Sequence, residues 1–459
     1  MQSQAHEMEE PPAVEESSAP VHARPGLYEW QQAHADQLVE ALCRHGFAMD
    51  GSDTGTGKTV IALEVAHRIG RIPFVVCPKS VIPAWVEMMK MFRPDDPTYF
   101  AYNYEKIRGG KTAFLARQGK KVSWRLNPDV CMLVFDEVHR CKGDKSLNSK
   151  MLAQAKDAGI PVLMLSATAC SNPVEMKAAG YLLEMHNYKN YWNWCLKTGC
   201  TKGVFGGLKF NNSPKVLKKL HDHIYPDRGS RIRIKDLPEG TFPDNLVIPQ
   251  GYNVDDPSAF DQIYTEMAEE LKALSERSAE GDDEESPLTI QLRARQKAEL
   301  LKVPVFMELA EDALSQRSSV AIFVNFTATL EALGSRLSAI APVVFVQGGQ
   351  SEAERSDMVD AFQRDSAHVI ICMTQAGGVG LSLHDRLGNR PRISLISPSF
   401  SAIDLKQALG RIHRAGSKSP AIQKIIFAAD SVEMGVCLAV RRKLTNLDLI
   451  NDDELNPVL

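Results

Sequence analysis

The stretch Ser52-Asp53-Thr54-Gly55-Thr56-Gly57-Lys58-Thr59 decides the fold of this chain. Gly55 and Gly57 permit a backbone turn that aims consecutive N–H groups at a phosphate, because glycine adopts conformations closed to other residues. Lys58 can reach the β- and γ-phosphates, and the Thr59 hydroxyl can ligate Mg²⁺. The stretch therefore predicts a phosphate-binding loop for ATP or GTP.

The sequence on either side of the loop supports this interpretation. The general pattern G-x-x-x-x-G-K-[ST] has Gly where this chain has Ser52, and a chance Gly/Thr turn is the alternative. However, the apolar residues 47–49 precede the loop and the helical run 60–66 follows it. A strand, a loop and the positive end of a helix are the usual setting of a phosphate site.

Short apolar runs of strand length alternate with helical stretches along the chain, which is typical of parallel sheets buried on both faces. The runs fall into an earlier and a later group, and the pattern predicts an α/β fold with two domains. The runs are residues 73–77, 131–135 and 162–165, then 320–324, 343–346, 369–373 and 393–396.

The same pattern suggests the domain boundaries. The region from about 175 to 315 is charged and expected to be helical, and its run 280–287 is expected to be an exposed loop. Tyr188, Tyr191, Trp192 and Trp194 are expected to form the core of a small helical subdomain, with base stacking as the alternative. The predicted parts are a disordered acidic tail (1–25), a first domain (26–245) with a helical insertion from about 175, a helical connecting segment (246–315), a second domain (316–445) and an acidic tail (446–459).

Composition places the chain among soluble, intracellular globular proteins. Of its 459 residues 44% are hydrophobic and 24% charged, and no apolar run approaches the roughly 20 residues that span a bilayer. Nine cysteines without a C-x-x-C pair favour buried thiols, and Cys195 and Cys200 near His186 make only a weak metal candidate. Residues 1–25 account for the net charge of −4, so charge neither supports nor excludes a polynucleotide partner.

The second chemical motif follows an apolar run. Residues 131–135 lead into Asp136-Glu137-Val138-His139. An Asp at the end of a strand beside the phosphate loop can hold the Mg²⁺ bound to Thr59. Glu137 next to it can polarise a water molecule for in-line attack on the γ-phosphate.

A third element, Leu165-Ser166-Ala167-Thr168, again lies at a strand end. The phosphate loop, the D-E-x-H box and the S-A-T triplet, in this order, resemble the first motor domain of superfamily 2 helicases and translocases. This resemblance implies two tandem RecA-like parallel-sheet domains. It also implies a coupling role for four residues, which are His139, Ser166, Thr168 and Gln407.

The second half of the chain sharpens the resemblance. Residues 374–383 (TQAGGVGLSL) and 407–416 (QALGRIHRAG) resemble two motifs of the SWI/SNF-type, chromatin-remodeller-like ATPases. Arg411 and Arg414 are three apart, so on a helix they would share a face. From there they could reach a γ-phosphate held by the other domain, where fixed positive charge stabilises the transition state.

The resemblance extends over about residues 27–430 and implies further contacts. Nucleotide contacts are implied for Gln31, Thr54, Gly55, Thr56, Gly57, Lys58, Thr59 and Gly380. Nucleic-acid contacts are implied for Lys79, Ser80, Asn325 and Thr374. Residues 231–238 (RIRIKDLP) are similar to the R-R-x-K-x-D-V-L-P segment of that branch.

Four motifs depart from the usual pattern of the SWI/SNF-type branch. That branch has D-E where this chain has Ser52-Asp53, and G-T-P where it has residues 166–168. Ser417 stands in place of a glutamine, and residues 397–402 replace D-P-x-W-N-P. The expected catalytic residues are present despite these four departures. The departures concern the assignment to this branch, and therefore the inference that the track is double-stranded DNA.

The leading hypothesis is an ATP-hydrolysing motor that uses ATP and Mg²⁺ to move along or remodel DNA, most simply double-stranded DNA. One alternative keeps the motor but makes the track RNA or single-stranded DNA, with unwinding of strands. The other is an ATP-gated switch that binds a protein partner, for which the acidic tails are candidate contacts. Glu137 and both arginines favour a motor over a switch.

Overall fold

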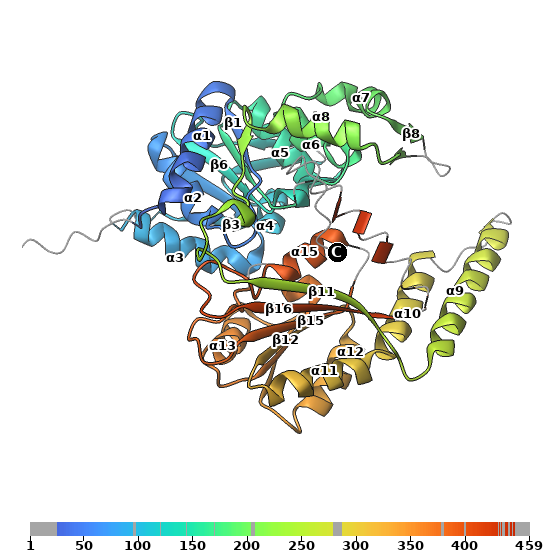
Figure 1. The fold of residues 1–459 in the computed structure, drawn as a ribbon. Helices are drawn as coiled ribbons and strands as arrows, with labels where there is room; N and C mark the ends of the chain where they lie inside the picture. Colours follow the sequence, from blue (N-terminus) through green and yellow to red (C-terminus); the bar gives the residue numbers. More distant parts are fainter. Residues whose placement is uncertain are drawn as a thin grey trace, which may run out of the picture.

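The computed structural model describes a chain folded into two α/β domains, one above the other in Figure 1. The described residues are 25–445, apart from 95–97, 120, 144, 169, 203–206, 279–286, 378–380, 399–400, 430, 432, 434–436, 439–440 and 443. Both predicted tails except Pro25, the predicted loop 280–287 except its last residue, and Gly380 therefore lie outside them.

The first domain is built on a parallel sheet. Within the described part of the chain, six strands follow the order β10-β1-β7-β6-β2-β3. All the apolar runs expected as strands here are confirmed, and β3 and β10 are additions at the two edges. The strands are β1 (Phe47–Asp50), β2 (Ile72–Cys77), β3 (Phe100–Asn103), β6 (Cys131–Asp136), β7 (Val162–Leu165) and β10 (Gly229–Ser230).

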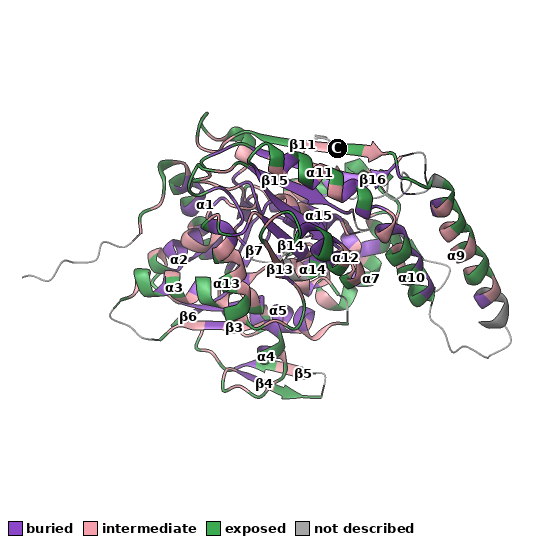
Figure 2. Ribbon diagram, turned by 90° about the horizontal axis from the view of Figure 1, so that it is seen from below, coloured by how far each residue is buried: buried purple, intermediate pink, exposed green. Residues whose placement is uncertain are grey.

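Helices cover both faces of this sheet, as its nearly continuous burial requires (Figure 2). One face packs on α1 (Glu29–His45), α2 (Lys58–Arg68) and α3 (Ile82–Phe92). The other packs on α4 (Tyr104–Arg108), α5 (Leu147–Asp157), α6 (Lys177–Leu182) and α8 (Pro214–Ile224). Two hairpins extend the domain, and they are formed by β4 (Leu115–Gln118) with β5 (Lys121–Trp124) and by β8 (Cys200–Lys202) with β9 (Leu208–Phe210).

The region from about residue 175 contains short helices and a hairpin, and its aromatic residues mostly form a core. Tyr191 on α7 (Tyr191–Lys197) is buried with Cys195 and Cys200, and Trp194 packs against them. Trp192 is exposed at 42%. Cys195 and Cys200 form no disulfide, and the His186 ring packs on Trp194. The described residues contain no group of three or more potential metal-binding side chains.

The second domain repeats the design of the first. Its described strands form a six-stranded parallel sheet in the order β11-β16-β15-β12-β14-β13. The strands are β11 (Asn245–Tyr252), β12 (Ser319–Val324), β13 (Val343–Val346), β14 (Val369–Met373), β15 (Arg392–Ile396) and β16 (Ala421–Ala428). The helices are α9 (Pro257–Ser278), α10 (Pro287–Leu300), α11 (Val303–Ser315), α12 (Thr327–Leu337), α13 (Glu352–Gln363), α14 (Thr374–Gly377) and α15 (Ala402–Leu409).

One expectation about the connecting segment is wrong. Residues 246–315 were expected to be helical throughout, but β11 (Asn245–Tyr252) is a strand that pairs with β16 over eight residues. The strand forms the edge of the sheet and is half exposed, and it contains Pro249 and Gly251. Such a strand carries little apolar pattern, because Pro and polar residues are tolerated at sheet edges. The second sheet therefore begins at Asn245.

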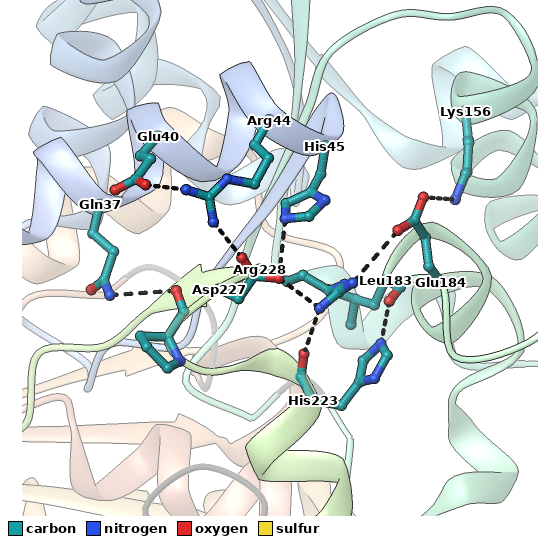
Figure 3. A network of polar contacts seen from close by, with 11 residues as sticks. Gln37, Glu40, Arg44, His45, Lys156, Leu183, Glu184, His223, Asp227 and Arg228 are labelled. Atoms are coloured by element: carbon teal, nitrogen blue, oxygen red, sulfur yellow. Dashed lines mark hydrogen bonds and ion pairs between the residues drawn. The ribbon is translucent and has the colours of Figure 1, made fainter.

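A polar network fastens the end of α1 to the approach of β10 (Figure 3). Asp227 accepts a hydrogen bond from Arg44 at 2.7 Å and lies 3.2 Å from His45 Nε2. Arg228 also contacts Asp227 at 2.7 Å, and His223 Nε2 lies 2.7 Å from the Leu183 carbonyl oxygen. These contacts hold the chain to the first domain just before it crosses to the second.

A buried ion pair stabilises the second domain, and its loss gives a first prediction. Lys302 is 1% exposed, and its ammonium donates to Glu433 at 2.8 Å and to Ser397 at 3.3 Å. Lys302→Ala leaves a buried carboxylate without its cation, which is expected to cost about 3–5 kcal/mol of unfolding free energy. Urea denaturation followed by circular dichroism measures this change.

The matched control is Lys297→Ala, which removes an exposed lysine 3.8 Å from Glu266. Exposed pairs contribute less than about 1 kcal/mol, so the control is expected to unfold close to wild type. Equal effects of the two substitutions would contradict the structural importance of the buried pair.

A search of the described residues finds no helix with the length and hydropathy needed to cross a membrane.

Candidate ATP site between the two domains

The phosphate loop joins β1 to α2, as the sequence predicts. Gly55 and Gly57 have φ of 87° and 88°, which is the left-handed region that other residues rarely adopt. The Lys58 ammonium donates to the carbonyl oxygens of Ser52 and Asp53, at 2.8 Å each. Burial lowers the pKa of Lys58, although four nearby carboxylates oppose this shift. The two carbonyl oxygens therefore hold the Lys58 side chain inside the loop.

Gln31 lies against the same loop. Its Nε2 donates to the Thr56 carbonyl oxygen at 2.8 Å, and its Oε1 accepts from the Tyr28 backbone at 2.9 Å. A Cβ at Gly57 would lie 2.6 Å from Gln31 Nε2, and the positive φ of Gly57 favours glycine at this position. The start of α1 is therefore joined to the loop, where an adenine-contacting residue is expected.

Asp136 ends β6 and is held by two aromatic residues. Trp85 Nε1 donates to Asp136 Oδ2 at 2.9 Å, and the Tyr104 hydroxyl donates to the Asp136 carbonyl oxygen at 2.8 Å. Burial and the neighbouring charge of Glu137 raise the pKa of Asp136 to about 6. The two carboxylates thus repel one another at the end of the strand.

Glu137 is the better ionised of the two carboxylates. Burial opposes its charge, but the hydrogen bond and charge of His139 and the nearby Lys58 and Arg411 lower the pKa of Glu137 to about 2. Its Oε2 lies 3.2 Å from His139 Nδ1. Its φ of 54° is uncommon for a residue other than glycine, and such conformations gather at functional sites.

Three of the four predicted coupling residues lie together. His139 Nδ1 is 3.3 Å from Ser166 Oγ, and the Thr168 backbone donates to that oxygen at 3.1 Å. Gln407 lies on α15 in the other domain, with 3% of its surface exposed. Its Nε2 is buried without a hydrogen bond, and the structure shows none between Gln407 and His139.

Arg411 and Arg414 reach the cleft from the second domain, but not from a helix. α15 ends at Leu409, so the expectation that a helical face presents them is wrong. They converge through a turn instead, because both guanidinium groups donate to the Leu381 carbonyl oxygen, at 3.3 and 2.9 Å. Burial lowers the pKa of Arg411, against the attraction of Glu137 and Asp136. Burial and Arg411 lower that of Arg414 to about 9.

The turn that ends α15 packs directly on the phosphate loop. A Cβ at Gly410 would lie 2.7 Å from Thr54 Cβ, and a Cβ at Gly55 would lie 3.1 Å from Arg414 Cγ. Gly410 is therefore required for close approach of the domains, and it also ends the helix, since glycine is a poor helix former. Lys58, Asp136, Glu137 and Arg411 lie close enough for their charges to act on one another across the two domains.

The predicted nucleic-acid contacts are less uniform. Lys79 is exposed at the carboxyl end of β2, and Ser80 beside it is half-buried. Asn325 follows β12 and donates to Glu299 at 2.7 Å, while Thr374 is 3% exposed and donates to the Val324 carbonyl oxygen at 2.9 Å. Asn325 and Thr374 follow neighbouring strands, and their polar groups are engaged within the domain.

The structure adds contacts that the motifs did not indicate. Buried Asp50 accepts from the Ser52 backbone at 2.9 Å and lies 3.3 Å from His34 Nε2, which joins α1 to the loop. Asp53 pairs with Arg231 at 2.9 Å across 178 positions of sequence. Asp50 ends an apolar run, which is a weak signal, and nothing local indicates the Asp53–Arg231 pair.

Comparisons with known proteins agree with this geometry. Residues 302–416 match the family profile of the helicase conserved C-terminal domain. A protein of Acanthamoeba polyphaga mimivirus, provisionally named an ATP-dependent RNA helicase, is 33% identical over 94% of this chain and 84% of its own length.

Two further comparisons are more distant. A Caenorhabditis elegans homologue of the SWI/SNF-related, matrix-associated, actin-dependent regulator of chromatin subfamily A-like protein 1 is 23% identical over 90% of this chain and 61% of its own length. The solved SWI2/SNF2 ATPase core of Sulfolobus solfataricus, in complex with double-stranded DNA, is 17% identical, covers 95% of both chains and has a TM-score of 0.36. With the viral relative matched over most of both chains, this chain belongs to the ATP-dependent helicases and is an ATP-dependent nucleic-acid motor.

Proposed function

We propose that this motor hydrolyses Mg²⁺-ATP in the cleft between its domains in order to move along or remodel double-stranded DNA. The observation that carries the chemistry is the convergence of Lys58, Asp136 and Glu137 from one domain with Arg411 and Arg414 from the other. Opening and closing of the cleft would then step the domains along the track.

The roles follow from the chemistry of the groups. Lys58 and the loop N–H groups bind the phosphates, and Glu137, kept ionised, orients the attacking water molecule. Arg411 and Arg414 stabilise charge on the γ-phosphate when the second domain closes. A motor needs all of these groups in one cleft, whereas a partner-binding switch needs only the nucleotide contacts.

Thr59 and Asp136 would hold the magnesium ion. A hydroxyl and a carboxylate are oxygen ligands of the kind Mg²⁺ prefers. Burial and the repulsion from Glu137 both raise the pKa of Asp136, and a divalent cation would stabilise the two carboxylates in this environment. The ion would neutralise negative charge on the β- and γ-phosphates.

The track is recognised through its backbone. A motor that ignores sequence contacts phosphates and sugars, and we assign this role to Lys79, Ser80, Asn325 and Thr374. Double-stranded DNA is favoured by the SWI/SNF-type motifs, and the nematode relative is named a regulator of chromatin. RNA is the second candidate, because the viral relative is named an RNA helicase.

The choice of track is tested by the steady-state ATPase rate in low salt. The rate is measured without polynucleotide and with double-stranded DNA, single-stranded DNA or RNA. Duplex DNA is expected to stimulate most, by about tenfold or more, since nucleic acid would favour the closed cleft. Greater stimulation by RNA or single strands would assign the protein to an unwinding motor. No stimulation by any of them would favour the partner-binding switch.

The acidic segments 1–25 and 446–459 are proposed contacts for a basic protein partner. Five Glu lie in the first segment, and Asp452, Asp453 and Glu454 lie in the second. Clustered like charge of this kind is typical of interaction tails. We infer an intracellular location, in the cytoplasm or in the nucleus or nucleoid, where a nucleic-acid track is found.

A further inference from the structure

The phosphate loop is joined to the segment that leads into the second domain. The backbone of Gly51 donates to Ser230, and that of Asp53 donates to Ile232, at 3.1 and 3.0 Å. The Ile232 backbone in turn donates to Ser52 Oγ at 2.9 Å. The segment thus runs beside the loop as an extension of β10.

The Asp53 carboxylate also binds the segment that leads into the second domain. One oxygen accepts from Arg231 at 2.9 Å, and the other accepts from the Ile234 backbone at 3.0 Å. The Arg231 side chain is 7% exposed and that of Asp53 22%, so water screens the pair only in part. The carbonyl oxygen of the same Asp53 accepts the Lys58 ammonium at 2.8 Å. A single residue therefore contacts both the ATP-binding lysine and the crossing segment.

Residues of the second domain also lie near Asp53. Asp53 and Arg231 line a cavity of about 670 Å³ together with Lys406, Gly410 and His413 of the second domain. Burial disfavours the charge of Asp53, but Arg231, Lys406 and Lys58 together lower its pKa. The carboxylate therefore lies in the field of three cations, from the loop, the crossing segment and the opposite domain.

The two ends of the crossing segment belong to different domains. Up to Ser230 the chain is held to the first domain by β10 and by the network around Asp227 (Figure 3). From Asn245 it forms β11 in the second sheet, below the first domain in Figure 1. Any rotation of the second domain relative to the first must therefore change the backbone between Ser230 and Asn245. Asp53 contacts this stretch just after Ser230.

We propose that Asp53 is a positioning residue that couples closure of the second domain to the position of Lys58. This inference rests on the proposed ATP site. When the second domain closes, Lys406 and the crossing segment change the forces on the Asp53 side chain. The backbone of Asp53 then moves, and with it the Asp53 carbonyl oxygen that accepts the hydrogen bond from Lys58. The charge of Asp53, more than its shape, carries this coupling.

The test is the preference of the protein for a non-hydrolysable ATP analogue, AMP-PNP, over ADP. Closure on the γ-phosphate produces this preference, and it needs neither nucleic acid nor turnover. Asp53→Asn keeps an oxygen for the Ile234 N–H but removes the charge. It is expected to reduce the preference about five- to tenfold, which is the usual size of a coupling between sites.

Three variants make the result decisive, each first checked by thermal unfolding. Asp53→Glu keeps the charge and is expected to restore most of the preference. Glu239→Gln removes another carboxylate from the wall of the same cavity and is expected to behave as wild type. An unchanged preference in Asp53→Asn, or equal loss in Asp53→Glu, would overturn the coupling role. A wild type that binds neither nucleotide would instead overturn the proposed ATP site.

Discussion

Lys58→Ala is expected to reduce ATP turnover to the background of the assay, a loss of at least about a thousandfold. The ammonium lies among Asp50, Asp136 and Glu137 and is held by two loop carbonyl oxygens, so it is placed to balance the charge of incoming phosphates. Phosphoryl transfer depends almost wholly on such positioning and charge stabilisation. Phosphate release, measured with saturating duplex DNA, checks the prediction.

Lys121→Ala is the matched control, because it removes an exposed lysine from the β5 hairpin, away from the cleft. It is expected to retain the wild-type rate. Hydrolysis that survives in purified Lys58→Ala would show that the loop between β1 and α2 is not the catalytic phosphate site.

Arg411→Ala is expected to lower the rate by about 10³–10⁵ while ATP still binds. The guanidinium is 3% exposed and lies close enough to Glu137 and Asp136 for their charges to act on its pKa. Its charge is therefore desolvated and directed at the cleft, where charge develops in the transition state. Single-turnover hydrolysis, together with the dissociation constant of a fluorescent ATP analogue, separates catalysis from binding.

Two further variants control this measurement. Arg336→Ala removes an exposed arginine from α12 of the same domain and is expected to leave the rate unchanged. Arg411→Lys keeps the charge but loses the planar guanidinium, and it is expected to recover only part of the rate. A rate for Arg411→Ala within tenfold of wild type would exclude a catalytic role for this arginine.

The two parallel sheets could be predicted from local sequence. Strands buried on both faces are continuous apolar runs, so β2, β6, β7, β12 and β14 were recognisable, and their carboxyl ends locate Asp136 and Ser166. The edge strand β11 was missed because exposure removes that signal. β16 was missed because Gln423 interrupts its apolar run, although Gln423 is buried through hydrogen bonds to Ser394 and Asn245.

Local sequence alone was enough to predict the phosphate loop, the D-E-x-H box and two arginines near the end of the second domain. Each depends on neighbouring residues whose spacing is set by a strand, a turn or a helix. Only the tertiary structure decided that Arg411 and Arg414 converge through a turn, and that Asp53 meets Arg231. These contacts join residues far apart in the chain, and packing between elements, rather than local backbone preference, brings them together.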